Sequence, residues 1–318
     1  MKGTVYKSTG SWYQVKADDG RFFDCRIKGK FRIKGIKSTN PVAVGDRVEF
    51  KVESNAEEEQ NGVITDIAER ENYIIRKSVN LSKQTHIIAS NIDQAFLLVT
   101  LNNPPTFTTF IDRFLVTAEA YHIKAILLFN KIDSYKPVEL DEVKYLAAMY
   151  RQIGYQCIGI SAKTGKNVEQ VKELMKDKTS MISGHSGTGK STLINAIEPK
   201  LDLKTTEISE QHRQGQHTTT FAEMFDLDFG ARIIDTPGIK GFGVVDMEKE
   251  ELGDYFPEFF ARKQDCKFYN CLHLEEPKCA VKDALDAGEI PWSRYKSYLQ
   301  ILKGEDEQNY RFDNHQQE

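Results

Sequence analysis

The residues best suited to chemistry lie in a glycine-rich stretch at 184–191, Gly-His-Ser-Gly-Thr-Gly-Lys-Ser, which fits the phosphate-binding pattern GxxxxGK[ST]. Glycines let a backbone fold closely around phosphates, with successive N–H groups pointing inward. Lys190 is expected to contact the β and γ phosphates, and the Ser191 hydroxyl to bind Mg²⁺. A chance match in a glycine-rich turn is the alternative, and the strand expected before the loop and the helix expected after it argue against that reading. The candidate phosphate-binding residues are Gly184, His185, Ser186, Gly187, Thr188, Gly189, Lys190, Ser191 and Thr192.

Two further short motifs could read a guanine base, and both follow expected strands at the sheet edge where α/β folds bind ligands. Asp133 can accept hydrogen bonds from guanine N1–H and N2–H₂, whereas adenine has no such donor pair and would leave the carboxylate unpaired. Asn130 would brace the loops, the Lys131 stem would lie along the base, and a backbone N–H of the second motif would reach guanine O6. Each motif alone is weak, and together they make chance improbable. The motifs are Asn130-Lys131-Ile132-Asp133 and Ser161-Ala162-Lys163.

The remaining nucleotide-site candidates would surround Mg²⁺ and the γ-phosphate. Asp235 ends an expected strand and should hold Mg²⁺ through water, and the Gly238 N–H should meet the γ-phosphate. In the stretch 217–220, His-Thr-Thr-Thr, one threonine hydroxyl should reach Mg²⁺ when GTP is bound. Thr219 is the preferred ligand, with Thr218 left open.

The sequence leaves more than one possibility for the group that orients the attacking water. Many GTPases place a glutamine after the glycine of the DxxG motif, but here the residue is Ile239, which cannot polarise water. Either hydrolysis is intrinsically slow or another group serves. His217 is the catalytic candidate beside Lys190, because it adjoins the threonines and has a near-neutral pKa. His217 could instead only shape the loop, and His212 is a weaker rival.

A second chemical cluster has the spacing C-x4-C-x-H-x5-C near the C-terminal end. Three thiolates and one imidazole complete a tetrahedral zinc site with no open position for chemistry, so one structural Zn²⁺ is expected. Free buried cysteines beside a surface histidine are the alternative. The other two cysteines, Cys25 and Cys157, lie in strand-like runs and are expected in the core. The candidate ligands are Cys266, Cys271, His273 and Cys279.

A third candidate is a basic strand at 26–34. Cations alternate there with Ile, Gly and Phe, and a period of two puts the cations on one face of a strand. With aromatic residues nearby, this face suits RNA, since cations meet phosphates and exposed rings stack on bases. A solvated charged face with its aromatics in the core is the alternative. The cations are Arg26, Lys28, Lys30, Arg32 and Lys34, and the aromatics are Tyr6, Trp12, Tyr13, Phe22 and Phe23.

Three regions would position these groups. Residues 1–70 show short β-type runs separated by turn signals, typical of a five-stranded barrel of the OB type. Residues 71–243 alternate strand and helix, which predicts a mostly parallel sheet covered on both faces. Residues 244–318 are rich in charge and predict short helices around the cysteine cluster. Expected strands are 96–100, 124–129, 157–160, 180–183 and 231–234, and expected helices are 107–122, 139–151, 168–175, 190–197 and 292–302.

Composition narrows the class of protein. The 318 residues favour two or three domains, and 40% hydrophobic residues suffice for ordinary cores. A net charge of −4 excludes a globally basic nucleic-acid binder. No run reaches the ~18 apolar residues of a membrane helix, and the first residues lack the apolar run of a signal peptide. A cytoplasmic protein without membrane partners is expected, and the odd number of cysteines argues against a disulfide framework.

The order of the motifs is unusual, because the base-reading motifs precede the phosphate loop and Asp235 follows it. With the stretch Gly215-Gln216-His217-Thr218-Thr219-Thr220 and the cysteine cluster, nearly the whole chain resembles the circularly permuted ribosome-associated GTPases. The resemblance implies an OB domain, a permuted GTPase core and a zinc domain. It also implies late maturation of the small ribosomal subunit, with hydrolysis that the ribosome stimulates.

The implied partners are GTP or GDP, the small ribosomal subunit and its ribosomal RNA, with the chain itself a monomer. The alternative is an RNA-binding assembly factor that uses GTP only as a structural ligand, which Ile239 keeps open. A third class, an ATP-dependent kinase or ATPase, is opposed by Asp133. Because the core would end just past the γ-phosphate-sensing segment 238–243, we also expect the GTP state to reposition the zinc domain against the barrel.

Overall fold

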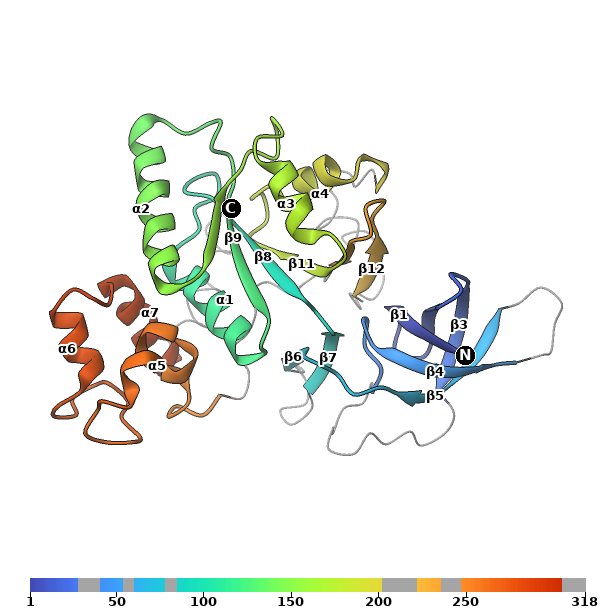
Figure 1. Cartoon of the computed structure of the whole chain (residues 1–318), viewed down its shortest axis with the longest axis horizontal. Coiled ribbons are helices and arrows are strands. Elements are labelled where there is room, and N and C mark those ends of the chain that lie inside the picture. The colour runs from blue at the N-terminus through green and yellow to red at the C-terminus, as the bar shows by residue number, and fades with distance from the viewer. Residues whose placement is uncertain (28–40, 54–59, 78–84, 202–221, 236–246, 305–318) are drawn as a thin grey trace, which may run out of the picture.

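The computed structural model describes residues 1–27, 41–53, 60–77, 85–201, 222–235 and 247–304, which form a β-barrel, an α/β core and a helical C-terminal region (Figure 1). The barrel contains β1 Lys2–Ser8, β2 Tyr13–Ala17, β3 Phe22–Ile27, β4 Arg47–Val52 and β5 Asn61–Ile67. The order β1-β2-β3-β5-β4 is closed by pairing of β1 with β4, and β3 lies parallel to β5. The expected five-stranded barrel is therefore confirmed.

The barrel closes around side chains from alternate positions of its strands. Val5, Val15, Phe23, Phe50 and Ile64 point inward and are almost fully buried. Their neighbours along the strands face outward, as the period of two requires. The chain enters β4 through a tight turn in which Gly45 has φ +94°. A Cβ at Gly45 would lie 2.0 Å from the Ser90 carbonyl oxygen, so only glycine fits there.

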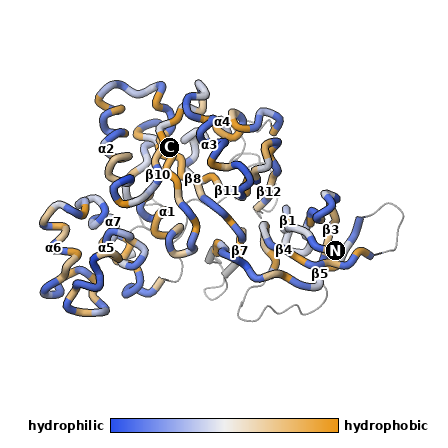
Figure 2. The backbone as a smooth tube through the Cα atoms, viewed as in Figure 1, coloured by the Kyte–Doolittle hydropathy of each residue, from blue (hydrophilic) through white to orange (hydrophobic). Residues whose placement is uncertain are grey.

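The α/β core is a sheet of six strands in the order β10-β9-β8-β11-β13-β12, parallel except for β12. One hydrophobic cluster packs α1 and α2 against one face, and a second packs α3 and α4 against the other. Figure 2 shows hydrophobic residues gathered along the central strands. The predicted doubly covered sheet is confirmed. Its strands are β8 Gln94–Val99, β9 Lys124–Phe129, β10 Gln156–Gly159, β11 Thr179–Ser183, β12 Glu223–Asp226 and β13 Arg232–Asp235, and its helices are α1 Thr108–Ala120, α2 Pro137–Ile153, α3 Val168–Met175 and α4 Lys190–Ile197, followed by a 3₁₀ turn at Pro199–Leu201.

A hairpin that sequence reasoning missed joins the barrel to the core. It consists of β6 Tyr73–Lys77 and β7 Thr85–Ser90, paired antiparallel. Beside it, the fully buried Asp46 carboxylate accepts hydrogen bonds from Arg70 Nε and Nη2, both at 2.6 Å, and from Ser90 Oγ at 2.6 Å. Through Ser90 at the end of β7, the buried Asp46 carboxylate thus anchors the barrel to the hairpin.

A second junction joins the barrel to the far edge of the core sheet. Strand β1 pairs with β12 at Lys7 and Glu223, so barrel and core form one continuous sheet. Asp226 on β12 accepts hydrogen bonds from the Tyr6 hydroxyl at 2.6 Å and from Lys16 Nζ at 2.5 Å. The barrel therefore contacts the strand that follows the predicted Mg²⁺-binding threonines.

The C-terminal region packs its own small core against α1. It comprises a 3₁₀ turn at Leu252–Tyr255, α5 Pro257–Lys263, α6 Ala280–Asp286 and α7 Trp292–Lys303. Val116 of α1 belongs to the same hydrophobic cluster as Phe256, Phe259 and Tyr298. Across the described ranges, none of the helices combines the length and apolar character needed to cross a membrane.

Candidate functional site

The phosphate loop has the geometry that its glycines favour. Strand β11 leads into it and α4 begins at Lys190. Gly184, Gly187 and Gly189 adopt φ of +146°, +82° and +99°, a region that other residues rarely enter. A Cβ at Gly189 would lie 2.5 Å from Asn130 Nδ2, which explains glycine there. The loop is therefore shaped so that neighbouring groups can approach its backbone closely.

Lys190 lies across this loop. Its ammonium donates hydrogen bonds to the carbonyl oxygens of Gly184 and His185, both at 2.7 Å. Burial lowers the pKa of Lys190 to about 8, and the nearby Asp235 carboxylate partly offsets that effect. A partly buried cation held across this glycine-rich loop is prepared to bind an anion.

Asn130 connects the base-reading motifs to the phosphate loop. Its side chain is 2% exposed. Nδ2 donates to the Thr188 carbonyl oxygen at 2.8 Å, and Oδ1 accepts from the Ala162 N–H at 3.0 Å. Three stretches that are far apart in sequence therefore meet at one amide group.

The other base-motif residues lie around Asn130. Lys131, with φ +67°, donates from Nζ to the carbonyl oxygens of Gly187, at 2.8 Å, and Asn103. Asp133 and Lys163 are exposed, each at the end of its motif, and Ser161 is buried. Ile132 packs toward Gly159, where an added Cβ would lie 3.5 Å from its side chain. The exposed Asp133 carboxylate is thus positioned to meet an incoming ligand.

Sequence reasoning missed the loop after β8, at residues 100–106, which lies against the same site. A Cβ at Gly187 would lie 3.3 Å from Pro104 Cδ, and Thr100 Oγ1 donates to the Pro104 carbonyl oxygen at 2.7 Å. Its position after the carboxyl end of a buried central strand was the signal that could have identified it. This loop forms one wall beside the phosphate loop.

The predicted Mg²⁺ side of the site is described only in part. Ser191 and Thr192 lie in the first turn of α4, and Asp235 ends β13, which pairs with β11. His217, Thr218, Thr219, Gly238 and Ile239 lie outside the described residues. Ser191 and Asp235 thus lie on neighbouring elements at one edge of the sheet.

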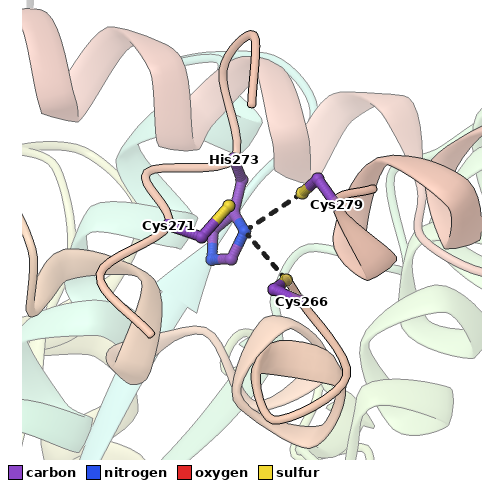
Figure 3. Close-up of side chains that lie close together, drawn as sticks. All are labelled: Cys266, Cys271, His273 and Cys279. Atoms are coloured by element: carbon purple, nitrogen blue, oxygen red, sulfur yellow. Dashed lines mark hydrogen bonds between the residues drawn. The ribbon is translucent and has the colours of Figure 1, made fainter. Parts of the chain in front are cut away.

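The four predicted metal ligands converge in the C-terminal region (Figure 3). All four ligand atoms lie within 4.8 Å of one another. His273 Nδ1 lies 3.3 Å from Cys279 Sγ and 3.8 Å from Cys266 Sγ. Metal–sulfur bonds of about 2.3 Å and metal–nitrogen bonds of about 2.0 Å in a tetrahedron give similar separations between ligands. The cluster therefore could hold a metal ion.

The loop that carries these ligands is held by groups that the sequence analysis did not single out. The Tyr295 hydroxyl donates to the His273 carbonyl oxygen at 2.6 Å, and the Tyr298 hydroxyl donates to the Leu272 carbonyl oxygen at 2.7 Å. Glu276 accepts the N–H groups of Leu272 and Leu274. Two tyrosines spaced i and i+3 on α7 were the available signal. Such outer contacts orient the ligands of a metal site.

The structure of the barrel corrects the prediction that five aromatic residues lie near an RNA-binding face. Tyr6, Tyr13 and Phe23 are buried, so these three aromatics belong to the core and cannot stack on bases. Trp12 and Phe22 are 48% and 40% exposed and line a hollow of about 510 Å³. The hollow is also lined by Gln14, Asp24, Gln60 and Asn61. The barrel therefore has a hollow lined by two exposed aromatic rings and several amide side chains, and not a surface with five exposed rings.

The cations of the described barrel are largely matched by carboxylates. Arg26 is exposed and pairs with Glu53 at 2.9 Å, whereas Lys28, Lys30, Arg32 and Lys34 lie outside the described residues. Such exposed ion pairs are weak, so a phosphate can replace the carboxylate. The other pairs are Lys2–Glu49, Lys7–Glu223, Lys16–Asp226, Arg21–Asp19 and Arg47–Asp18.

The sheet, the phosphate loop and the preceding base motifs together define a circularly permuted P-loop GTPase. The family model RsgA GTPase matches residues 67–245, and the model RsgA N-terminal domain matches residues 2–64. The chain belongs to the RsgA GTPase family. The predicted family, fold class and GTPase activity are thereby confirmed.

Relatives match over almost their whole length. A protein from Christiangramia forsetii named small ribosomal subunit biogenesis GTPase RsgA is 78% identical, over 99% of this chain and 100% of that relative. A protein of the same name from Flavobacterium johnsoniae is 66% identical, over 98% and 96%. The crystal structure of YjeQ from Thermotoga maritima matches with a TM-score of 0.77 and 35% identity, over 95% of this chain and 97% of that one. The structure of YloQ, described as a circularly permuted GTPase, matches with a TM-score of 0.73 and 32% identity, over 96% and 95%.

Proposed function

We propose that this chain binds the immature small ribosomal subunit, assists its late maturation and leaves after GTP hydrolysis that the ribosome stimulates. The main support is the site in which Asn130 joins the phosphate loop to both base-reading motifs. The names of the relatives, small ribosomal subunit biogenesis GTPase, supply the subunit as partner. In this proposal residues 1–70 bind ribosomal RNA, residues 71–243 hydrolyse GTP and residues 244–318 hold zinc. The chain acts as a monomer in the cytoplasm.

In the proposed reaction each residue has one role. Asp133 selects guanine, and Lys190 leaves its two carbonyl partners to contact the β and γ phosphates. Ser191, and Asp235 through water, would hold Mg²⁺, with Thr219 joining them when GTP is bound, and the ion would supply positive charge to offset charge that develops on the phosphates. His217 orients the attacking water. If His217 only shapes its loop, His217→Ala will leave stimulated turnover intact.

The proposal is tested by measuring phosphate release from GTP, with and without purified small ribosomal subunits, at moderate salt. We expect strong stimulation by the subunits and little by large subunits. Tight GTP binding with turnover that neither subunit changes would instead favour an assembly factor that holds GTP as a structural ligand. Ile239 favours that second function, because it cannot polarise water.

The pH dependence of nucleotide binding offers a separate prediction. Because burial lowers the Lys190 pKa to about 8, this group loses its proton in the empty site as pH rises through that value. Phosphate binds the ammonium form, so GDP affinity should fall with rising pH, by up to about tenfold per unit above pH 8. Titration of a fluorescent GDP analogue from pH 7 to pH 9 measures this fall.

The matched control for that titration is Lys190→Arg. Arginine stays protonated throughout the range, so the variant should bind GDP with an affinity that changes far less between pH 7 and pH 9. The same slope in both proteins would assign the pH dependence to another group.

The metal in the C-terminal region is proposed to be one structural Zn²⁺. Three thiolates with an imidazole are typical zinc ligands, and three of the four residues, Cys271, His273 and Cys279, are buried. His273 Nδ1 is the nitrogen that would bind the ion, since it faces the sulfurs while Nε2 packs toward Gly253. The ion would stabilise the fold and take no part in hydrolysis.

Removal of one ligand should therefore release the metal. We expect Cys279→Ala to reduce zinc from about one ion per chain to nearly none and to loosen the C-terminal region, because metal binding and folding are coupled in such sites. Elemental analysis of the purified protein gives the zinc content. Cys157→Ala is the control, since Cys157 is equally buried but lies in the α/β core. Full zinc content in Cys279→Ala would contradict the assigned ligand set.

A further inference from the structure

Helix α1 contacts the phosphate loop with one side of its first turns. The Phe110 ring stacks on the His185 ring, with centroids 4.0 Å apart and an angle of 29° between the planes. The carbonyl oxygen of His185 also accepts hydrogen bonds from Lys190 Nζ at 2.7 Å and Thr188 Oγ1 at 2.8 Å. A shift of Phe110 would thus move the residue that positions the phosphate-binding lysine.

The other side of α1 is held by the C-terminal region. Thr109, Asp112 and Val116, spaced i, i+3 and i+7, lie on one stripe. Thr109 Oγ1 donates to Gln300 Oε1 at 2.8 Å, and Val116 lies in the C-terminal hydrophobic cluster. The bridge between the two regions is therefore a continuous helical face, and Asp112 is at its centre.

Asp112 is the buried electrostatic anchor of this contact. It and Arg294 of α7 are both fully buried, with Nη1 2.7 Å from Oδ1. The Tyr150 hydroxyl from α2 donates to the same oxygen at 2.8 Å. Arg294 also binds the Glu258 carboxylate of α5 through Nε and Nη2. A buried pair with this much hydrogen bonding fixes one geometry, since breaking it leaves a charge without its partner.

The helix that carries Arg294 also carries the tyrosines that hold the metal loop. Tyr295 follows Arg294 directly and donates to the His273 carbonyl oxygen, and Tyr298 lies one turn on. An unbroken set of contacts therefore runs from His185 through α1 and α7 to His273.

We propose that α1 couples the metal-binding cluster to the nucleotide site, so that metal loss weakens nucleotide binding and bound nucleotide slows metal loss. Phe110 and Arg294 are positioning residues in this coupling. The coupling rests on the proposed zinc and GTP sites, but neither of those sites requires it. Linkage makes the two effects reciprocal, and couplings of this kind typically amount to about five-fold or more in affinity.

The test uses the full chain with Mg²⁺ present throughout. Affinity for a fluorescent GDP analogue is measured with zinc bound and after zinc is stripped by a chelator that leaves Mg²⁺ in place. We expect GDP to bind about five-fold or more weakly to the stripped protein. Zinc release to a coloured chelator should slow by a comparable factor when GDP is bound. Equal GDP affinity in the two forms overturns the coupling.

Matched variants separate coupling from general damage. In Phe110→Leu the ratio of the two GDP affinities should move toward one, because the ring stack is lost while the position stays apolar. Phe114→Leu makes the same change one turn along α1, also in the buried core, and should keep the wild-type ratio. If metal loss acted by unfolding the whole chain, Phe110→Leu would leave the ratio large and the proposal would fail. Zinc-loaded protein that binds no GDP would instead refute the proposed GTP site.

Discussion

Asp133→Asn is expected to weaken GTP and GDP binding by roughly a hundred-fold or more, since two charge-assisted hydrogen bonds at about 1.5–3 kcal/mol each depend on the carboxylate. Asp133 is exposed at the end of the base-reading motif, while Asn130 and Lys131 of the same motif donate hydrogen bonds to carbonyl oxygens of the phosphate loop. The change should therefore remove base recognition and leave the loop framework in place. Equilibrium titration with fluorescent nucleotides measures the loss.

Xanthine nucleotides give the matched control for that loss. Xanthine carries a carbonyl at C2 where guanine carries an amino group, so an asparagine amide can donate where aspartate could only accept. The variant should bind xanthosine diphosphate more tightly than the wild-type protein does. If Asp133→Asn bound GDP as well as wild type, the assignment of the guanine-reading residue would be wrong.

Arg294→Met is expected to lower the free energy of unfolding of the C-terminal region by roughly 3–5 kcal/mol, because it leaves Asp112 and Glu258 as buried charges without their cation. The chain has two tryptophans, Trp12 and Trp292. In a Trp12→Phe background, fluorescence of Trp292 at the start of α7 reports on this region alone. Urea unfolding followed by that signal gives the change in stability.

Two comparisons isolate the buried charge as the cause. Arg262→Met removes an arginine from the exposed pair with Glu289 in the same region and should cost less than about 1 kcal/mol. Neutralising both carboxylates together with Arg294→Met, by Asp112→Asn and Glu258→Gln, should restore much of the lost stability. A small effect of Arg294→Met alone would mean that water reaches the two carboxylates.

Local patterns allowed much of the fold to be predicted. Helices α3 and α4 and strand β9 have the bounds expected from periodicity, because each lies between unambiguous loops. Helix α2 begins at Pro137 rather than at 139, since proline suits the first turn of a helix, and it ends before Gly154. The metal cluster could be anticipated because its four ligands lie within fourteen residues.

What the sequence could not reveal depends on contacts between distant residues. Asp112 and Arg294 are 182 positions apart, and Asp46 contacts Ser90, which belongs to the next region of the chain. Each of these charges alone resembles a solvated surface residue. Likewise, Tyr6 was read as part of an RNA face, but pairing of β1 with β12 buries it against Asp226. Whether the GTP state repositions the C-terminal region stays a prediction, and the buried contact with α1 restricts any such movement to one that carries α1 along.

The ion pairs on the barrel surface bear on how salt would affect RNA binding. A phosphate that meets Arg26 or Lys16 takes the place of a carboxylate rather than of solvent. Binding to single-stranded nucleic acid normally weakens with salt in proportion to the counterions set free, with a slope of about −0.7 per phosphate contact. Each displaced carboxylate would gather cations from solution again and cancel part of that release. The proposed binding of RNA to the barrel should therefore show a shallower salt dependence than the number of phosphate contacts suggests.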